Sequence, residues 1–162
     1  KKIVDFWYAI DRAFRSLLAG YYHGDVLKVG KLKMSLKGKT VRIVLPNGFT
    51  LRYHGAKIND ADEITYLGIN VKTFTWSVIY TWGGKIAQNI TEAVGRCLLG
   101  EALVDMETEC LDPVLHVHDE AICESDADRL PEFKACLERP RAWAAGLPVV
   151  ADCHVMHRYR KL

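Results

Sequence analysis

The stretch Val114-Leu-His-Val-His-Asp-Glu-Ala-Ile-Cys-Glu124 reads as two short apolar strands joined through His118-Asp119. A two-residue hairpin turn normally takes Asn-Gly, Asp-Gly or a leading glycine, because its central residues need positive φ. Here a histidine and an acid occupy the predicted tip, and a second acid, Glu120, follows at once. Carboxylates on a rigid tip are suited to a divalent metal, since hard cations take oxygen ligands. A solvated acidic turn is the alternative, and the hairpin alone does not choose between them.

Helical and β patterns alternate on either side of this hairpin. Apolar residues at i, i+3, i+4 spacing predict helices over 3–19 and 85–107, and a shorter amphipathic helix over 126–138. Residues 26–80 alternate with period two instead, which predicts an antiparallel sheet of three to five strands with a hairpin at Pro46-Asn47-Gly48. A last helical turn and a closing strand over 149–151 complete an α+β fold.

Composition allows one domain, because 162 residues with 49% hydrophobic content can bury a core. The net charge of +2 argues little for nucleic acid, but the cations are clustered. One cluster comprises Lys28, Lys31, Lys33, Lys37, Lys39 and Arg42, and a second comprises Arg158, Arg160 and Lys161. Such clusters are typical of phosphate binding, and lysine-rich strands also protect a sheet edge from aggregation. Both interpretations stay open.

The five cysteines form no Cys-x-x-Cys pair, so we expect most to be small buried residues in a reducing cytoplasm. The sequence shows no signal peptide and no apolar run long enough to cross a membrane, which predicts a cytoplasmic protein without a membrane partner.

A second segment, Thr81-Trp-Gly-Gly-Lys-Ile-Ala-Gln-Asn-Ile-Thr-Glu-Ala-Val-Gly-Arg-Cys-Leu-Leu-Gly100, precedes the hairpin. Together the two segments resemble the C-terminal palm of the family A (DNA polymerase I-like) DNA polymerases, above all the phage-encoded members. Those enzymes have an aromatic-Gly-Gly-Lys start to a long helix, followed by a hydrophobic-His-Asp-Glu hairpin called motif C. The opening Ile3-Val-Asp-Phe-Trp-Tyr8 and the closing Trp143-Ala-Ala-Gly-Leu-Pro148 and Arg158-Tyr-Arg-Lys161 are similar too.

The resemblance implies one palm-like domain over 1–162, with an antiparallel sheet and a motif C hairpin flanked by helices, plus a small β-hairpin insert. Along the chain we expect a helix over 1–20, a small antiparallel sheet over 26–80, and a helix, the motif C hairpin and a C-terminal helix and strand over 85–162. It also implies template-directed DNA synthesis on primer-template DNA with deoxynucleoside triphosphates and Mg²⁺ or Mn²⁺, in a bacterial host cell, from a phage or prophage gene.

By residue-for-residue match, the resemblance makes Asp119 a metal ligand, Glu120 an auxiliary acid beside the metal, and His118 a neighbour of the primer terminus. Nucleotidyl transfer of this kind uses two metal ions about 3.5–4 Å apart. The helix after the Gly-Gly-Lys start offers a polar side chain to the duplex minor groove in the family. Its register is not fixed here, so three candidates stay open: Gln88, Asn89 and Glu92. Lys85 and Arg96 are candidate phosphate contacts, although an exposed helical cation is the favoured interpretation of each.

Two family motifs are missing. Motif A, Asp-Tyr-Ser-x-Ile-Glu, and motif B, Arg-x-x-x-Lys with a following Tyr-Gly, have no match, and the early acids Asp5 and Asp11 sit in an amphipathic helix. One carboxylate pair cannot hold both metals. We therefore expect a C-terminal polymerase fragment that is inactive alone and is completed by an N-terminal portion, in the same gene or on a separate chain.

Two other classes of function compete with this interpretation. A metal-dependent hydrolase or nuclease would use His116, His118 and Asp119, with His154 and His157 as further zinc or manganese ligands. A non-catalytic nucleic-acid-binding module would use the basic sheet and would stack bases on three aromatic residues, Trp76, Tyr80 and Trp82. For Trp76 we prefer a place in the sheet core.

Overall fold

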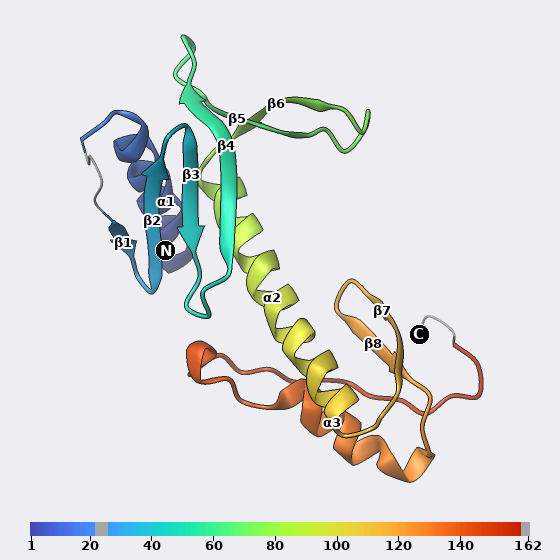
Figure 1. The fold of residues 1–162 in the computed structure, drawn as a ribbon. Helices are drawn as coiled ribbons and strands as arrows, with labels where there is room; N and C mark the ends of the chain where they lie inside the picture. Colours follow the sequence, from blue (N-terminus) through green and yellow to red (C-terminus); the bar gives the residue numbers. More distant parts are fainter. Residues whose placement is uncertain (22–25, 160–162) are drawn as a thin grey trace. The chain divides into compact units, whose positions relative to one another are not determined.

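The computed structural model describes residues 1–21 and 26–159, and Figure 1 shows their elements. The chain divides into two compact units, residues 1–93 and residues 94–162. The long helix α2 (Gly83–Thr108) begins in the first unit and ends in the second. Each unit has its own core. No helix of the described part is long and apolar enough to span a membrane.

The first unit consists of helix α1 (Lys2–Leu18), an antiparallel sheet and the first turns of α2. The sheet has six strands in consecutive order: β1 (Leu27–Val29), β2 (Leu32–Lys37), β3 (Thr40–Val44), β4 (Thr50–Ile58), β5 (Ile64–Ile69) and β6 (Trp76–Thr81). The predicted hairpin at Pro46-Asn47-Gly48 joins β3 to β4.

The core of the first unit lies between α1 and one face of the sheet. Alternate strand residues such as Met34 and Ile43 are fully buried, as is Phe14 on α1. The ring of Phe14 packs edge-on against Tyr53 with centroids 5.3 Å apart, and Tyr53 packs against Tyr66 at 5.0 Å. The Tyr53 hydroxyl accepts a hydrogen bond from Asn89 at 3.1 Å, which ties α2 to the sheet.

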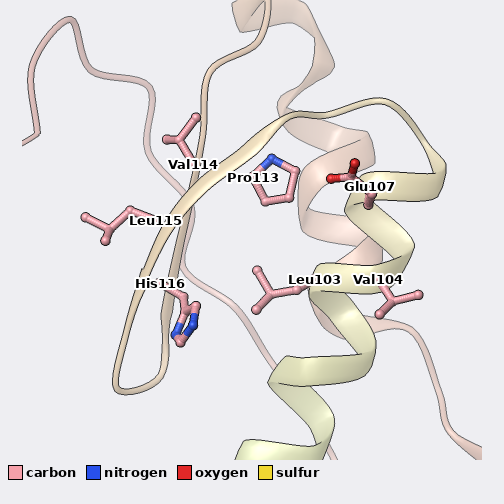
Figure 2. Close-up of a pocket in the computed structure, with 7 residues that line it drawn as sticks. All are labelled: Leu103, Val104, Glu107, Pro113, Val114, Leu115 and His116. Atoms are coloured by element: carbon pink, nitrogen blue, oxygen red, sulfur yellow. The ribbon is translucent and has the colours of Figure 1, made fainter.

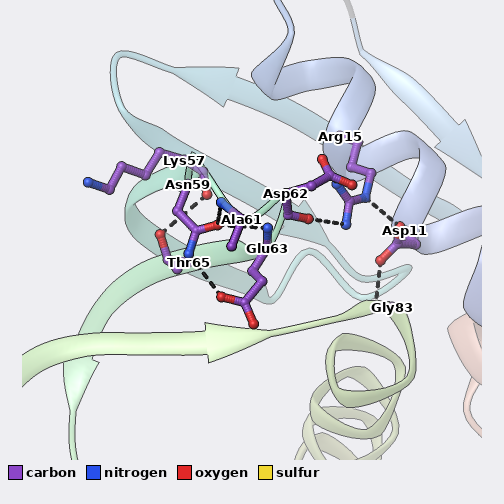
Figure 3. Close-up of polar contacts among 9 residues, drawn as sticks. All are labelled: Asp11, Arg15, Lys57, Asn59, Ala61, Asp62, Glu63, Thr65 and Gly83. Carbon is purple, nitrogen blue, oxygen red and sulfur yellow. Dashed lines mark hydrogen bonds and ion pairs between the residues drawn. The ribbon is translucent and has the colours of Figure 1, made fainter.

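The start of α2 lies against α1 in a close contact (Figure 3). The backbone N–H of Gly83 donates to the Asp11 carboxylate at 2.9 Å, and Asp11 also pairs with Arg15 at 2.8 Å. Arg15 reaches Asp62 in the β4–β5 turn at 2.9 Å. A Cβ on Gly83 would lie 2.3 Å from the carbonyl oxygen of Trp7, so only glycine fits this contact.

The second unit packs the end of α2 against a two-stranded sheet and a short helix. Its elements are β7 (Pro113–Val117), β8 (Glu120–Cys123), the 3₁₀ turn η1 (Ala127–Arg129), α3 (Leu130–Glu138) and the 3₁₀ turn η2 (Ala142–Ala144). A cluster of buried residues lies in its core: Ala102, Met106, Leu111 and Cys136.

The structure confirms the α+β class, with an antiparallel sheet, a separate two-stranded hairpin and flanking helices. The larger sheet has six strands rather than three to five. Residues 71–75 lie within the β pattern predicted over 26–80, but the last strand begins at Trp76, because the Asn70 side chain accepts hydrogen bonds from the backbone of Lys72 and Thr73 and closes a turn.

The prediction of a closing strand over 149–151 was wrong, because this segment is irregular. Pro148 has no N–H to offer a strand partner. The N–H of Ala151 donates to the Glu138 side chain at 2.8 Å instead of to another strand, and Val150 is 85% exposed. The expectation of buried cysteines holds fully for Cys136, whereas Cys110 is exposed and the other three are half-buried.

Candidate functional site

The predicted acidic hairpin is present in the second unit. Strands β7 and β8 pair antiparallel with Val117 opposite Glu120, which leaves His118 and Asp119 as the two turn residues. His118 has a φ of 54°, in the left-handed region where a hairpin turn ordinarily uses glycine. A non-glycine residue held there is strained, and such strain is often found at functional sites.

The core of the second unit fixes the base of this hairpin. Ala121 and Cys123 on β8 pack against the buried cluster of α2 and α3. Burial raises the pKa of the Cys123 thiol to about 11, which keeps it neutral inside this contact. Arg129 donates to the backbone carbonyls of Glu109 and Cys110 at 2.7 Å each, just beyond the end of α2. Because the last carbonyls of a helix lack partners within the helix, this arginine stabilises the chain where it turns into β7.

The two carboxylates at the tip are exposed. No cation of residues 1–21 or 26–159 forms an ion pair with Asp119 or Glu120. The hydroxyl of Tyr159 donates a hydrogen bond to Glu120 at 3.0 Å. This hydrogen bond raises the pKa of Tyr159, because the nearby carboxylate favours the protonated phenol. Among the described residues Asp119 thus has no partner, whereas Glu120 accepts the hydrogen bond of Tyr159.

A shallow pocket of about 320 Å³ lies between β7 and the end of α2 (Figure 2). Leu103, Val104 and Glu107 line it from the helix, and residues 113–116 line it from the strand. Figure 2 shows His116 on the side of the strand that faces α2, near Leu103. His116 therefore lies beside an apolar wall.

The hydrolase interpretation requires several metal ligands to meet. Over the residues that the structure describes, no group of three or more His, Cys, Asp or Glu side chains is placed to hold a metal ion. The ring of His154 lies 3.3 Å from the Asp152 carboxylate rather than among the hairpin histidines. The ligand set of that alternative is therefore not assembled in this part of the chain.

The candidate DNA contacts on α2 do not all lie together. Lys85 donates to Gln88 at 3.1 Å, and Gln88 donates to Glu92 at 2.7 Å, so these three exposed side chains share one face. Asn89 is on another face, bonded to Tyr53. Arg96 is exposed and belongs to the second unit. The structure thus places Lys85, Gln88 and Glu92 together, whereas Asn89 is hydrogen-bonded to Tyr53.

Sequence reasoning missed Tyr159, whose contact with Glu120 spans 39 positions and follows no periodic pattern. The preference for Trp76 in the sheet core was also wrong, because its side chain is 59% exposed. Tyr80 and Trp82 are exposed as well. Of the C-terminal basic group, Arg158 is exposed, and Arg160 and Lys161 lie outside the described residues.

Comparison with known proteins gives one informative similarity. The chain is 31% identical to the DNA polymerase of Bacillus phage SP02. The alignment is 169 residues long and covers 99% of this chain but 26% of the phage protein. The chain therefore spans about a quarter of the length of this relative. No protein-family model matches the chain, and no solved structure matches it.

Proposed function

We propose that this chain is the part of a family A DNA polymerase that contributes the motif C carboxylates, on Asp119 and Glu120, to template-directed DNA synthesis. What supports the proposal above all is the similarity of nearly the whole chain to a phage protein named DNA polymerase. The exposed His118-Asp119-Glu120 tip is compatible with it, because catalytic carboxylates must be accessible to substrate.

The tip residues fit a divalent metal. Exposed carboxylates without a cationic partner among the described residues are suitable ligands for Mg²⁺ or Mn²⁺. A metal bound there supplies neutralisation of the charge on the transferring phosphoryl group. Asp119 is the proposed principal ligand, since nothing described competes for it. Glu120 accepts a hydrogen bond from the Tyr159 hydroxyl, which suits an auxiliary role.

His118 is proposed to orient the primer terminus. Its backbone adopts a φ of 54° in the two-residue turn, next to the proposed metal ligand Asp119. On α2, Gln88 is the proposed minor-groove contact, with Lys85 and Glu92 on the same face. The minor groove presents acceptors that vary little with sequence, which suits a copying enzyme.

The remainder of the polymerase is proposed to supply the first metal-binding aspartate and the triphosphate-binding lysine, neither of which has a motif in this chain. Primer-template DNA and deoxynucleoside triphosphates are then the substrates. The cytoplasm of a bacterial host is the proposed location, in agreement with the phage origin of the relative.

A chimera tests this proposal directly. The chain replaces the aligned segment of the phage SP02 DNA polymerase, and primer extension is measured with Mg²⁺ and all four nucleotides. We expect extension by the chimera and none by the isolated 162-residue chain. A folded chimera without extension, or robust extension by the isolated chain, contradicts the proposal.

A further inference from the structure

One face of the six-stranded sheet packs on α1, and the opposite face is lined by cations. The strand register places four of them in two directly facing pairs, Lys28 opposite Lys33 and Arg42 opposite Arg52. Lys37 lies on the same face of β2 as Lys33, four positions further along the strand. We call this set of five side chains the basic face.

In the part of the chain that the structure describes, the cations of the basic face have no acidic partners. The stretch from Val26 to Ile58 contains no aspartate or glutamate. None of the five side chains forms an ion pair with any residue that the structure describes. The Nε of Arg42 is buried and lacks a hydrogen-bond partner in the described part of the chain. Like charges facing each other across strands destabilise a sheet, so folding alone does not account for them.

The basic face continues into an aromatic surface on β5 and β6. His54 follows Arg52 by two positions on β4 and therefore lies on the same face. Its ring lies beside Trp76, with centroids 6.4 Å apart. Tyr80 also projects from this face, and the exposed fractions of Trp76 and Tyr80 are 59% and 64%.

Apolar strand residues surround these two rings. Leu67 pairs with Val78 and Ile69 pairs with Trp76, and all four side chains are exposed. The sheet therefore presents exposed rings on the same face as cations that have no acidic partner among the described residues. Exposed aromatics next to clustered cations are the combination by which proteins bind single-stranded nucleic acids, with bases stacked on rings and phosphates on cations.

We propose that the outer face of the six-stranded sheet binds single-stranded nucleic acid, with the phosphates on the basic face and bases stacked on Trp76 and Tyr80. A single strand is favoured over a duplex because the π-faces of paired bases are hidden inside the stack. The surface belongs wholly to the first unit and uses none of the β7–β8 carboxylates. Its binding is therefore measured without a catalytic assay and independently of the proposed function.

Fluorescence anisotropy of an end-labelled oligothymidine of about twenty nucleotides tests the surface, with the full chain as titrant. We expect binding that weakens steeply with salt. Trp76→Ala should weaken it about fivefold to a hundredfold, and Trp76→Phe, which keeps a ring, should retain most of the affinity. Arg42→Gln/Arg52→Gln should lower the salt slope by about 1.4, because each phosphate contact on a single strand contributes roughly 0.7.

Two controls separate binding from misfolding. Lys2→Gln/Arg12→Gln removes the same charge from α1, on the opposite side of the sheet, and should leave the affinity within about twofold, since exposed distant charges are screened. Arg42→Gln/Arg52→Gln should raise the melting temperature of the free chain, because it relieves the facing charges. The proposal would be overturned if the α1 control lost as much affinity as Arg42→Gln/Arg52→Gln. Tighter binding to a duplex of the same length than to the single strand would also overturn it. A third contrary result would be that the oligothymidine stays unbound, while sedimentation shows that the chain self-associates through Trp76.

Discussion

The Asp11 carboxylate on α1 accepts a hydrogen bond at 2.9 Å from the backbone N–H of Gly83, the first residue of α2. The first N–H groups of a helix lack partners within the helix and form the positive end of its dipole, so a carboxylate is favoured there. The contact brings α1 so close that Gly83 has no room for a Cβ, and a Cβ on Gly84 would meet the ring of Trp82. The Gly-Gly pair thus has a structural reason that is separate from any catalytic one.

We expect Gly83→Ala to destabilise the protein by about 1–3 kcal/mol, the usual cost of inserting a methyl group into a filled space. The added Cβ would lie 2.3 Å from the Trp7 carbonyl oxygen and 2.8 Å from the Asp11 Cβ. Urea unfolding followed by circular dichroism measures the change. Gly95→Ala is the matched control on the same helix, because nothing lies within 4 Å of its added Cβ. That variant should gain roughly 0.5–1 kcal/mol from helix propensity. Similar changes in the free energy of unfolding for Gly83→Ala and Gly95→Ala would contradict the close contact between α1 and α2.

The strained turn residue gives a second prediction. His118→Gly should raise the free energy of unfolding by about 0.5–1 kcal/mol, since glycine adopts positive φ without the side-chain penalty. His118→Ala keeps the penalty and should bring no such gain. Thermal unfolding of both variants makes the comparison. A His118→Ala protein as stable as His118→Gly would show that the turn does not hold this residue in the left-handed region.

Stability at high pH should depend on Tyr53. Burial raises the pKa of Tyr53 to about 12 in the folded state, against 10.0 for an unperturbed tyrosine. Below pH 10 both states are protonated and the contribution does not change. Between pH 10 and 12 the unfolded state loses the proton first, so the free energy of unfolding falls as pH rises, by up to about 2–3 kcal/mol from this residue.

Urea titrations at several pH values across this window measure that loss. Tyr53→Phe should start from a lower stability, because it removes the hydrogen bond from Asn89, but its stability should fall less steeply with pH. Burial also raises the pKa of Tyr66, which remains in the variant, so a smaller fall in stability with pH should persist there. If the free energy of unfolding of Tyr53→Phe fell with pH as steeply as that of the parent, Tyr53 would not be buried as described.

The sequence predicted what local patterns encode. Apolar strands on both sides of His118-Asp119 predicted the hairpin and its tip, and the spacing of apolar residues predicted α2 almost to its ends. Contacts between distant positions carry no such pattern, and the Glu120–Tyr159 and Asp11–Gly83 bonds were missed for this reason.

Trp76 shows a different limit of the sequence. A period of two indicates which side chains share a face of a strand, but not whether that face is covered. The alternation correctly placed Trp76 in a strand, and the preference for the core failed because this side of β6 is exposed. The roles assigned to Asp119, Glu120, His118 and the α2 side chains stay predictions, because they depend on substrates and on the rest of a polymerase.

Single-nucleotide incorporation by the chimera, with the hairpin carboxylates changed one at a time, tests the central claim most directly. Asp119→Asn keeps the shape of the tip and removes one full charge, and we expect a loss of about a hundredfold to a thousandfold in rate. Glu120→Gln should cost less, because Glu120 is assigned only an auxiliary role and is already held by Tyr159. Equal losses for the two variants, or a near-normal rate for Asp119→Asn, would contradict the assignment of this hairpin as the metal-binding motif.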